Sequence, residues 1–365
     1  MKQALRLAAR GRGTTSPNPV VGAVIVSKGK VVGTGYHKQA GGPHAEIHAL
    51  HKAKSRARGS TLYVTLEPCC HTGKRTPPCV PRLIEAGIHR VVVAMRDPNP
   101  RVSGRGIRQL RQAGLNVEAG CLQKDAEQLN EAYVHWIKTG RPFVILKTAM
   151  TLDGKIATAS GESKWITGPK AREHVHRLRR QVDAILVGIN TVLKDDPQLT
   201  VRLPGKTNHP KTVRQPIRVI LDSRLRTPMT ARVLQSTHEN STLIFTTHQA
   251  PKKKIEQLHA KGADVIVLPQ KGERVSMGAC LQYLGKKGVT SLMVEGGSEI
   301  NAVFLRSGLV NRLMLYIAPA ILGGQDAKSW VGGNSPKHLS GKAMVSDVTI
   351  QRLGQDILIA GDVSK

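Results

Sequence analysis

The stretch HAEIHAL (residues 44–50), followed by LEPCCHTGKRTPPC (residues 66–79), gathers a His-x-Glu and three cysteines. The whole chain holds only five cysteines, so this clustering needs an explanation. Zinc prefers tetrahedral nitrogen and sulfur ligands, and a catalytic zinc keeps one position open for water. One histidine and two cysteines would supply three ligands. These stretches therefore predict a catalytic zinc centre and a fold built to hold it.

A glutamate two residues after the histidine indicates what such a centre would do. Glu46 can lie beside the bound water, take its proton and later deliver that proton to a leaving amine. The order H-x-E, then Pro-Cys, then a further Cys is the signature of zinc deaminases. His44, Cys69 and Cys79 follow this order. The pattern predicts a deaminase.

Either of two adjacent cysteines, Cys69 or Cys70, could be the second metal ligand. Nine residues separate Cys69 from Cys79, and eight separate Cys70 from Cys79. A closed structural zinc site is the alternative, with Cys70 or His71 as its fourth ligand. Plain buried cysteines are another. Either alternative would leave Glu46 without a task, and we therefore favour the catalytic site.

The charge of the chain indicates anionic ligands. Lys and Arg number 55 against 25 Asp and Glu, which gives a formal net charge of +30. Such an excess suggests a polyanionic partner, small phosphorylated substrates, or simply solvated basic faces. Aromatic residues make up 3% of the chain, which argues against a protein that stacks single-stranded bases. In the loop between the cysteines, His71, Lys74 and Arg75 could close over a phosphorylated substrate.

Length and apolar patterning predict a two-domain cytoplasmic protein. A chain of 365 residues is too long for one ordinary core. Its start has no apolar segment of the kind found in secretory signals, and no run of 18 apolar residues predicts a membrane span. The cysteine spacing is not that of a disulfide framework, which fits a reducing cytoplasm.

The first part of the chain alternates helical and strand patterns, which predicts a three-layer α/β domain. The predicted elements are a helix over 2–10, a hairpin over 20–37 turning at Lys28 and Gly29, a helix over 44–54, a strand over 60–69, a helix over 76–87, a strand over 90–100, and a helix with a short strand over 104–120.

A connecting helix over 122–142 places the domain boundary, giving domains 1–142 and 143–365. The second domain repeats the α/β rhythm. Its predicted strands cover 143–154, 184–188, 217–222, 242–247, 263–269, 291–297 and 312–322. It lacks the G-x-G-x-x-G of an ordinary dinucleotide fold. Glycines in the turn from Glu295 to Ser298 could bring backbone close to a phosphate, or form a plain strand–helix turn.

The chain resembles the bifunctional riboflavin-biosynthesis deaminase/reductases over nearly its whole length. The deaminase half is matched by SPNPVVGAVIV, HAEIHAL, YVTLEPCCHTGKRTPPC and RDPNPRVSGRGI. The reductase half is matched by KTAMTLDGKIATASGESKWITG, LVGINTVLKDDPQLTVR and VEGGSEI. The resemblance implies an N-terminal cytidine-deaminase-like three-layer domain and a C-terminal dihydrofolate-reductase-like domain.

The resemblance also implies two reactions and two cofactors. The first is zinc-dependent hydrolytic deamination of 2,5-diamino-6-(5-phosphoribosylamino)pyrimidin-4-one. The second is reduction of the ribosyl side chain by NADPH, which gives 5-amino-6-(5-phosphoribitylamino)uracil. One zinc ion per chain and NADPH are thus expected, with a small phosphorylated pyrimidine as substrate.

Site residues follow from the same resemblance. His44, Cys69 and Cys79 would hold zinc, Glu46 would carry the proton, and Asn18 would contact the pyrimidine, unless it only forms an Asx turn before Pro19. The NADPH site would be lined by Ala149, Trp165, Thr191, Asp195, Ser223, Gly297, Ser298, Glu299, Ile300, Asn301, Ala302 and Val303. The substrate of the reductase would meet Ser163, Arg179, Leu199, Arg202 and Glu295.

Three of these side chains also have a physical rationale. The planar guanidinium groups of Arg179 and Arg202 can hold a ribose phosphate through paired hydrogen bonds. Lys147 lies in a predicted strand, where burying a bare ammonium is unfavourable without a partner. We suggest that Lys147 is catalytic, polarises the substrate near the hydride acceptor, and is paired with Glu295.

Two other functions fit parts of the sequence. A nucleic-acid deaminase with an added basic domain would use the positive charge, although the long inter-cysteine loop and the scarce aromatic residues oppose it. A non-enzymatic zinc module joined to a nucleotide sensor would leave Glu46 unused. We expect no nucleic-acid partner and no membrane contact, and we expect a homo-oligomer.

Overall fold

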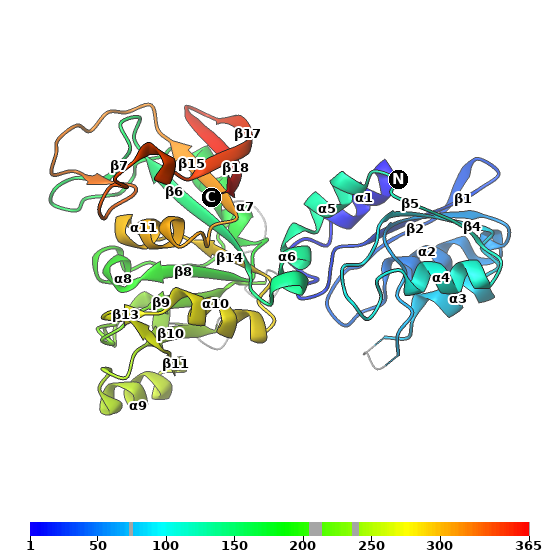
Figure 1. The fold of residues 1–365 in the computed structure, drawn as a ribbon, viewed down its shortest axis with the longest axis horizontal. Coiled ribbons are helices and arrows are strands. Elements are labelled where there is room, and N and C mark those ends of the chain that lie inside the picture. The colour runs from blue at the N-terminus through cyan, green and yellow to red at the C-terminus, as the bar shows by residue number, and fades with distance from the viewer. Residues whose placement is uncertain (73–75, 204–213, 236–240, 365) are drawn as a thin grey trace. The chain divides into compact units, whose positions relative to one another are not determined.

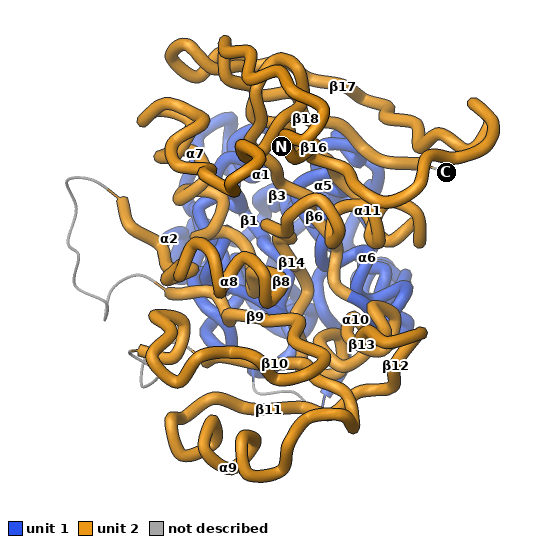
Figure 2. Tube along the Cα trace, turned by 90° about the vertical axis from the view of Figure 1, so that its left-hand side faces the viewer, with its two compact units in different colours: residues 1–141 blue, residues 142–365 orange. Residues whose placement is uncertain are grey.

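The computed structural model describes residues 1–72, 76–203, 214–235 and 241–364. Lys74 and Arg75, which the sequence suggested for substrate closure, lie outside these residues. The chain divides into two compact units, Met1–Arg141 and Pro142–Lys365, which Figure 2 colours separately. Over the described ranges, every helix is too short or too polar to cross a bilayer.

The first unit is a three-layer sandwich around a five-stranded sheet, as predicted. The strand order is β2-β1-β3-β4-β5, with β3, β4 and β5 parallel and β1 antiparallel to both of its neighbours. Figure 1 shows α1 and α5 on one face and α2, α3 and α4 on the other. The elements are α1 (Lys2–Ala9), β1 (Gly22–Ser27), β2 (Lys30–Tyr36), α2 (Ala45–Ala53), η1 (Lys54–Ala57), β3 (Thr61–Leu66), α3 (Cys79–Glu85), β4 (Arg90–Met95), α4 (Arg105–Gln112), β5 (Asn116–Ala119), α5 (Gln123–Leu129) and α6 (Glu131–Thr139).

Helix α2 packs directly on the backbone of β2, and this contact fixes where its first residues lie. A Cβ atom on Gly33 would come within 2.3 Å of the Ala49 carbonyl oxygen, and one on Gly35 within 2.1 Å of the Ala45 carbonyl oxygen. Any larger side chain at either position would push the helix away. The small buried residues Ala45, Ala49 and Ala53 complete the contact from the helix side.

The predicted hairpin is confirmed, with Lys28 and Gly29 both at positive φ in its turn. The predicted single helix over 122–142 is wrong, because the chain breaks at Asn130 into α5 and α6. The Asn130 side chain accepts a hydrogen bond from the Val20 N–H at 2.9 Å and donates one to the Val20 carbonyl at 3.0 Å. The backbone of Asn130 still bonds to Ala126 and Val134, so the break is a change of backbone direction at a residue whose side chain is held by Val20.

The second unit is built on a nine-stranded sheet of order β11-β10-β9-β8-β14-β6-β15-β18-β17, which Figures 1 and 2 both show from one end to the other. Strands from β11 to β15 run parallel, whereas β18 and β17 are antiparallel. The strands are β6 (Phe143–Met150), β7 (Lys155–Ala157), β8 (Ala184–Gly188), β9 (Ile217–Leu221), β10 (Thr242–Thr246), β11 (Ala263–Val267), β12 (Gln270–Lys271), β13 (Arg274–Val275), β14 (Ser291–Val294), β15 (Arg312–Ile317), β16 (Lys328–Ser329), β17 (Met344–Leu353) and β18 (Asp356–Ser364).

Each of the seven strands predicted for this unit is present, but β17 and β18 of the large sheet and the short strands β7, β12, β13 and β16 were not predicted. The helical elements are α7 (Pro169–Arg179), α8 (Ile189–Asp195), η3 (Arg232–Leu234), α9 (Lys252–Ala260), α10 (Met277–Lys286), α11 (Ser298–Arg306) and η4 (Leu339–Gly341). Side chains of α10 and α11, among them Leu284 and Phe304, share one buried core with the strands. The carboxyl ends of the parallel strands share one edge of the sheet, where ligands of such sheets bind.

Candidate active sites

In the first unit, three potential metal ligands meet where β3 ends and two helices begin. His44 stands just before α2, Cys69 follows β3, and Cys79 opens α3. The His44 Nδ1 atom lies 3.2 Å from the Cys79 sulfur and 3.4 Å from the Cys69 sulfur. The three ligand atoms all lie within 4.8 Å of one another.

This arrangement fits a zinc ion. Ligand atoms around a tetrahedral zinc lie roughly 3.6 to 3.8 Å apart, given bond lengths of about 2.0 to 2.3 Å. The measured separations are close to those values. The other ring nitrogen of His44, Nε2, lies 3.1 Å from the Thr76 hydroxyl oxygen. A donor role for Nε2 leaves the Nδ1 lone pair for the metal, which is how outer partners orient a ligating imidazole.

Cys69 rather than Cys70 belongs to this group of ligand atoms. Neither Cys70 nor His71 is part of it, so nothing among the described residues completes a closed four-ligand site. Cys70 instead packs against the hydrophobic core of the unit, and burial raises the pKa of its thiol. The geometry therefore leaves room for a fourth, exchangeable ligand.

Glu46 lies beside the ligands in the first turn of α2 and is only 3% exposed. Burial, and then the neighbouring Cys69, raise the pKa of its carboxyl group, whereas a hydrogen bond with the Cys79 side chain lowers it. A carboxyl group whose proton affinity is raised next to a metal centre suits a group that both accepts and releases a proton.

Asn18 also lies near the cluster, held by a histidine that the sequence analysis did not single out. The Asn18 amide nitrogen is 3.2 Å from His37 Nε2, and His37 Nδ1 is 3.1 Å from the Pro43 carbonyl oxygen. His37 must donate from Nδ1 to that carbonyl, so its Nε2 accepts from Asn18. The rings of His37 and His44 meet edge to face at 5.4 Å. In the sequence, His37 could have been noticed through its position seven residues before His44.

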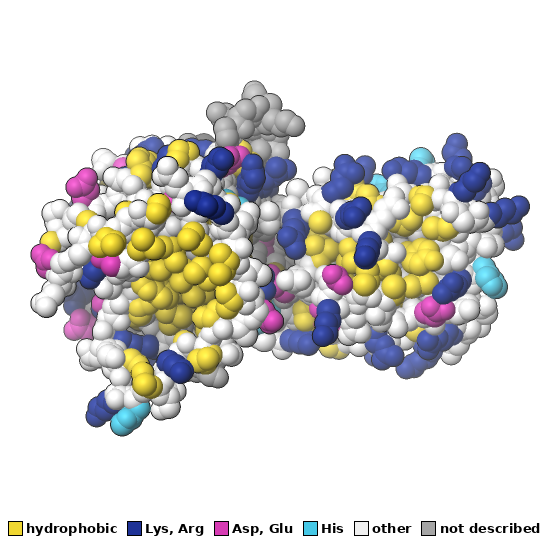
Figure 3. Space-filling model, turned by 90° about the horizontal axis from the view of Figure 1, so that it is seen from above, with side chains coloured by type: hydrophobic (Ala, Val, Ile, Leu, Met, Phe, Trp, Pro, Cys, Tyr) yellow, Lys and Arg dark blue, Asp and Glu magenta, His cyan; other side chains and the backbone are white. Residues whose placement is uncertain are grey.

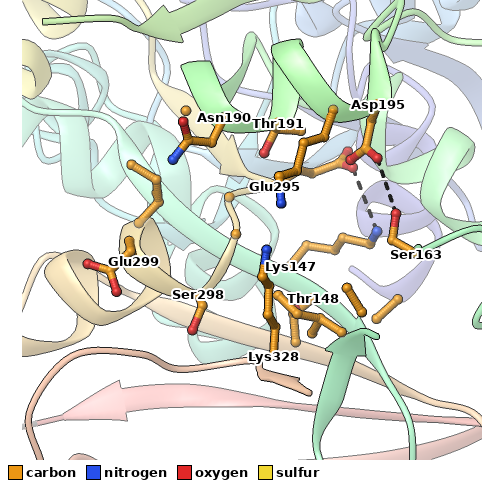
Figure 4. A pocket seen from close by; sticks show the side chains of 18 of the residues that line it. Lys147, Thr148, Ser163, Asn190, Thr191, Asp195, Glu295, Ser298, Glu299 and Lys328 are labelled. Atoms are coloured by element: carbon orange, nitrogen blue, oxygen red, sulfur yellow. Dashed lines mark hydrogen bonds and ion pairs between the residues drawn. The ribbon is translucent and has the colours of Figure 1, made fainter. Parts of the chain in front are cut away.

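In the second unit, a cavity of about 1230 Å³ opens at the carboxyl ends of the parallel strands. Figure 4 shows side chains from α8, β6 and the start of α11 around it. Most of the predicted reductase residues line this cavity: Lys147, Ala149, Ser163, Trp165, Arg179, Thr191, Asp195, Arg202, Ser223, Glu295, Gly297, Ser298, Glu299 and Ile300. Leu199, Asn301, Ala302 and Val303 do not line it.

The suggested pairing of Lys147 with Glu295 is present, with Nζ 3.6 Å from a carboxylate oxygen. Arg179 adds a second partner through two hydrogen bonds of 2.8 and 2.9 Å to the same carboxylate. Burial alone would raise the pKa of Glu295, but Arg179 and Lys147 outweigh it and lower that pKa to about 2. Burial lowers the pKa of Lys147, which Glu295 partly opposes.

This pairing changes the expectation for Arg179, which the sequence offered as a phosphate ligand. Its Nε and Nη2 bind Glu295, and its Nη1 donates to the Thr200 carbonyl at 3.1 Å. These bonds use three of its five N–H groups, and Arg179 also lines the cavity, so the role of phosphate ligand stays a prediction. The Arg202 guanidinium makes fewer hydrogen bonds than that of Arg179: it donates to the side chain of Gln198. The Arg202 backbone N–H donates to His176 Nδ1 at 3.2 Å.

Tyr316 completes the surroundings of Lys147 and was also missed from the sequence. It lies on β15 beside Ala149 of β6 and is 1% exposed. The Lys147 ammonium stands 5.7 Å from the centre of its ring, and its hydroxyl is 2.8 Å from His174 Nδ1. On the opposite wall, the Ser163 hydroxyl donates to Asp195 at 3.1 Å, as Figure 4 shows.

Comparison with known proteins gives one consistent result. The family models that match are "RibD C-terminal domain" over residues 142–359 and "Cytidine and deoxycytidylate deaminase zinc-binding region" over residues 1–95. Riboflavin biosynthesis protein RibD of Actinobacillus pleuropneumoniae is 46% identical over 98% of this chain and 93% of its own. The protein of the same name from Escherichia coli (strain K12) is 43% identical over 98% of this chain and 97% of its own.

Solved structures agree. Acinetobacter baumannii RibD (form 2) superposes with a TM-score of 0.88 at 38% identity, covering 100% of this chain and 97% of that one. A diaminohydroxyphosphoribosylaminopyrimidine deaminase/5-amino-6-(5-phosphoribosylamino)uracil reductase from Thermotoga maritima gives 0.85 at 36% identity, covering 100% and 97%.

The sulfur ligands can be tested by substitution. We expect Cys69→Ser and Cys79→Ser to lose zinc, because each removes one of three converging ligand atoms. Cys70→Ser is the matched control and should keep its metal. The measurement is zinc content by elemental analysis after washing with a chelator. Zinc loss in Cys70→Ser but not in Cys69→Ser would show that Cys70, rather than Cys69, is the zinc ligand.

The ion pairs of Glu295 predict a pH dependence of stability. Its pKa in the folded chain, about 2, lies below the usual 4.5, so its stabilising effect is complete above about pH 4.5 and fades as pH falls towards 2. Glu295→Gln should therefore destabilise the second unit by about 3 kcal/mol at neutral pH, and by progressively less in acid. Urea unfolding across this pH range measures the difference.

The control for that series is Glu256→Gln, on the exposed surface of α9 in the same unit. It should change the free energy of unfolding little at any pH, as is usual for exposed carboxylates. A Glu295→Gln effect that stayed constant from neutral pH down to pH 2 would contradict the ion-pair account.

Proposed function

The chain belongs to the family of bifunctional riboflavin-biosynthesis enzymes that join a zinc-dependent pyrimidine deaminase to an NADPH-dependent reductase, and we propose here which residues carry each reaction. The enzyme deaminates 2,5-diamino-6-(5-phosphoribosylamino)pyrimidin-4-one and reduces the ribosyl side chain of the product to ribityl. The identity of 46% over 98% of the chain is the observation that carries this conclusion.

For deamination we propose that His44, Cys69 and Cys79 hold the zinc ion. A zinc ion held there would supply the Lewis acidity that makes water a nucleophile near neutral pH. The Glu46 carboxylate takes the proton released from that water and passes it to the departing amine, which leaves as ammonia. The hydrogen bond from Asn18 to His37 leaves the Asn18 carbonyl oxygen to accept from the pyrimidine.

For reduction we propose that NADPH supplies the hydride and that the protein orients the two reacting carbons and excludes water. The Lys147 ammonium polarises the ribosyl group as it accepts the hydride. Glu295 keeps that ammonium charged and in place, and Arg179 in turn holds Glu295. Arg202 and Ser163 bind the substrate, with Arg202 facing its phosphate, and Leu199 supports this wall from within the core.

The cofactor would occupy the rest of the cavity, against Ala149, Trp165, Thr191, Asp195 and Ser223. The turn at Gly297 and the first turn of α11 offer backbone N–H groups to its pyrophosphate. Ser298, Glu299 and Ile300 line this part of the cavity. Asn301, Ala302 and Val303 would support the turn from behind; for example, the Asn301 amide holds the Trp330 carbonyl at 2.8 Å.

We assign deamination to residues 1–142 and reduction to residues 143–365, in keeping with the division of the chain into two compact units. We also propose that the enzyme works in the cytoplasm. None of its five cysteines forms a disulfide. The thiolates of a zinc site of this kind need reducing conditions to persist.

We propose further that two copies associate through the β17 edge of the large sheet. Figure 3 shows hydrophobic side chains gathered over the end of the second unit where β17 and β18 lie. Met344, Val348 and Ile350 of β17 are 51%, 51% and 72% exposed. An exposed edge strand with apolar side chains invites pairing, and the same edge of a second copy is self-complementary.

This association predicts that Ile350→Lys shifts the protein to a monomer. A charge at the interface would have to be desolvated without a partner, so association should weaken strongly. Sedimentation velocity over a range of protein concentrations measures the mass. Val267→Lys, at an exposed apolar position on the opposite edge strand β11, is the control. A wild-type protein that sediments as a monomer at all concentrations would refute the proposal.

Two substitutions test whether deamination and reduction take place in separate sites. Glu46→Gln should keep its zinc and lose deamination by roughly 10²–10⁴-fold, because the amide cannot carry the proton. Lys147→Ala should lose reduction by a comparable factor. Each variant should retain the other activity. Ammonia release and nicotinamide absorbance, followed separately with the diaminopyrimidine ribotide and its deaminated product, measure the two steps.

A substitution that impaired both reactions would contradict this assignment. If Glu46→Gln abolished reduction of the already deaminated substrate, or Lys147→Ala abolished ammonia release, the two activities would not reside in separate sites. Full deamination by Glu46→Gln would instead assign the proton transfer to another group.

A further inference from the structure

The buried surroundings of the Lys147 ammonium include an aromatic ring as well as a carboxylate. Tyr316, on β15, is 1% exposed, and the Lys147 Nζ atom stands over its ring, 5.7 Å from the centre. The ring hydroxyl lies 2.8 Å from His174 Nδ1. We propose that Tyr316 is a positioning residue of the reductase: the face of its ring holds the Lys147 ammonium, and His174 holds the ring. This inference rests on the proposed reductase function and adds a second partner that keeps its lysine charged and in place.

The ion pair with Glu295 does not neutralise the Lys147 ammonium completely. Glu295 faces two cations, because Arg179 binds the same carboxylate through two hydrogen bonds of 2.8 and 2.9 Å. The Lys147 Nζ atom stands further from it, at 3.6 Å. The side chains of Lys147, Glu295 and Arg179 are 15%, 12% and 12% exposed, so water screens their charges little. One negative charge shared by two buried cations leaves the ammonium in need of a further electron-rich partner.

The face of an aromatic ring is such a partner. Its quadrupole presents a negative potential to a cation within about 6 Å of the ring centre, and the attraction grows when water is excluded. Burial raises the pKa of the Tyr316 hydroxyl, so the phenol stays neutral. A second carboxylate at this place would have to be buried as an ion, which is costly. The ring of Tyr316 can therefore stabilise the ammonium without a second buried anion.

Strand pairing puts the ring and the lysine on one face of the sheet. Strands β6 and β15 run parallel, with Lys147 opposite Met314 and Ala149 opposite Tyr316. Side chains two residues apart along a strand point to the same face, so Tyr316 stands on the face that carries Lys147. Ala149 lines the cavity, which identifies this face as the cavity side of the sheet. The position of the ring beside the lysine is thus fixed by backbone hydrogen bonds.

Helix α7 holds both partners of the lysine. His174 of this helix approaches the Tyr316 hydroxyl, and the two rings lie 5.8 Å apart with a tilt of 53°. Arg179, five residues later on the same helix, binds Glu295. The ring and the carboxylate reach Lys147 from two different strands, but one helix sets the position of both.

This arrangement predicts how the pH dependence of reduction responds to the ring. Burial lowers the pKa of Lys147, Glu295 opposes this effect and Arg179 adds to it. The ring stabilises the charged form, so a weaker ring potential should lower that pKa further and move the alkaline loss of reduction to lower pH. The other groups keep their charge there. Burial would raise the pKa of Glu295, but its ion pairs lower it to about 2, and burial lowers the pKa values of His174 and His176.

The test varies the potential of the ring while its size stays nearly constant. In the full chain, Tyr316 is replaced by phenylalanine and by phenylalanines that carry one, two or three ring fluorines, each of which withdraws charge from the ring face. The kcat for reduction of the deaminated substrate by NADPH is followed against pH through the nicotinamide absorbance. The midpoint of the alkaline limb should fall stepwise with fluorine number, by about one pH unit over the series. KM for NADPH should not change.

Ordinary substitutions give a second measurement. Tyr316→Leu removes the ring, and should lower kcat for reduction about tenfold without changing ammonia release. Tyr316→Phe and His174→Ala each break the hydroxyl contact and keep the ring, so each should have a smaller effect. The double variant should be no worse than either single variant, because both remove the same contact. Unchanged NADPH affinity shows in each variant that the second unit is folded.

Tyr283 is the matched control, because it makes the same kind of contact away from the cavity. The Lys287 Nζ atom lies over its ring at the same distance, 5.7 Å, at the end of α10. The fluorine series at this position should leave the alkaline limb unmoved. Other lysines also line the cavity: Lys164, Lys170, Lys194 and Lys328. Among the described residues only Lys147 stands over the Tyr316 ring, so a shift that follows the fluorine number identifies its ammonium.

Three results would overturn the proposal. The alkaline limb could be absent or stay fixed across the series at Tyr316, the series at Tyr283 could shift it equally, or Tyr316→Leu could keep the full kcat for reduction. Failure of the reductase function itself looks different, because the wild type would then not oxidise NADPH in the presence of the deaminated substrate.

Discussion

The shared edge at which parallel strands end is the constraint on which both active sites depend. In the first unit β3 delivers Cys69 beside the starts of two helices. In the second unit β14 delivers Glu295, and β9 delivers Ser223, to one cavity. Helix starts and strand ends leave backbone N–H groups unpaired, which favours anions and thiolates at this edge. A sheet of this kind can therefore gather reactive groups that lie far apart in sequence.

Buried carboxylates fix the geometry of each site in different ways. Glu67, two residues before Cys69, accepts the backbone N–H groups of Asp97, Gly104 and Ile107 at 3.2, 2.9 and 3.1 Å. It ties the loop after β4 and the start of α4 to the strand that carries the zinc ligand. Glu295 instead binds charged side chains, so its position depends on ion pairs rather than on backbone. The first arrangement suits a rigid metal site, and the second holds the Lys147 ammonium in an ion pair within the cavity.

How much the sequence could predict depends on the range of each interaction. The zinc ligands could be predicted because His44 and Cys69 lie in short, local sequence motifs. A functional role for Lys147 could be predicted because a lysine in an apolar strand is unusual. The pairing of Arg179 with Glu295 spans 116 residues, and no local pattern encodes it. The break at Asn130 likewise depends on a partner 110 residues away. Of the two missed strands, β17 is exposed at most positions and lacks a long apolar run, whereas β18 is mostly buried or half-buried and its short apolar run ILIA was overlooked.

The large positive charge is partly explained by the reductase cavity. Eleven Lys and Arg line it against six Asp and Glu. Both of its ligands carry phosphate, and a concave site with low-dielectric walls concentrates a field of one sign on small anions. A nucleic-acid surface would instead need basic side chains spread along a groove with aromatic residues between them, and aromatic residues make up only 3% of this chain. Electrostatic steering into a cavity of about 1230 Å³ is therefore the better account of this part of the charge.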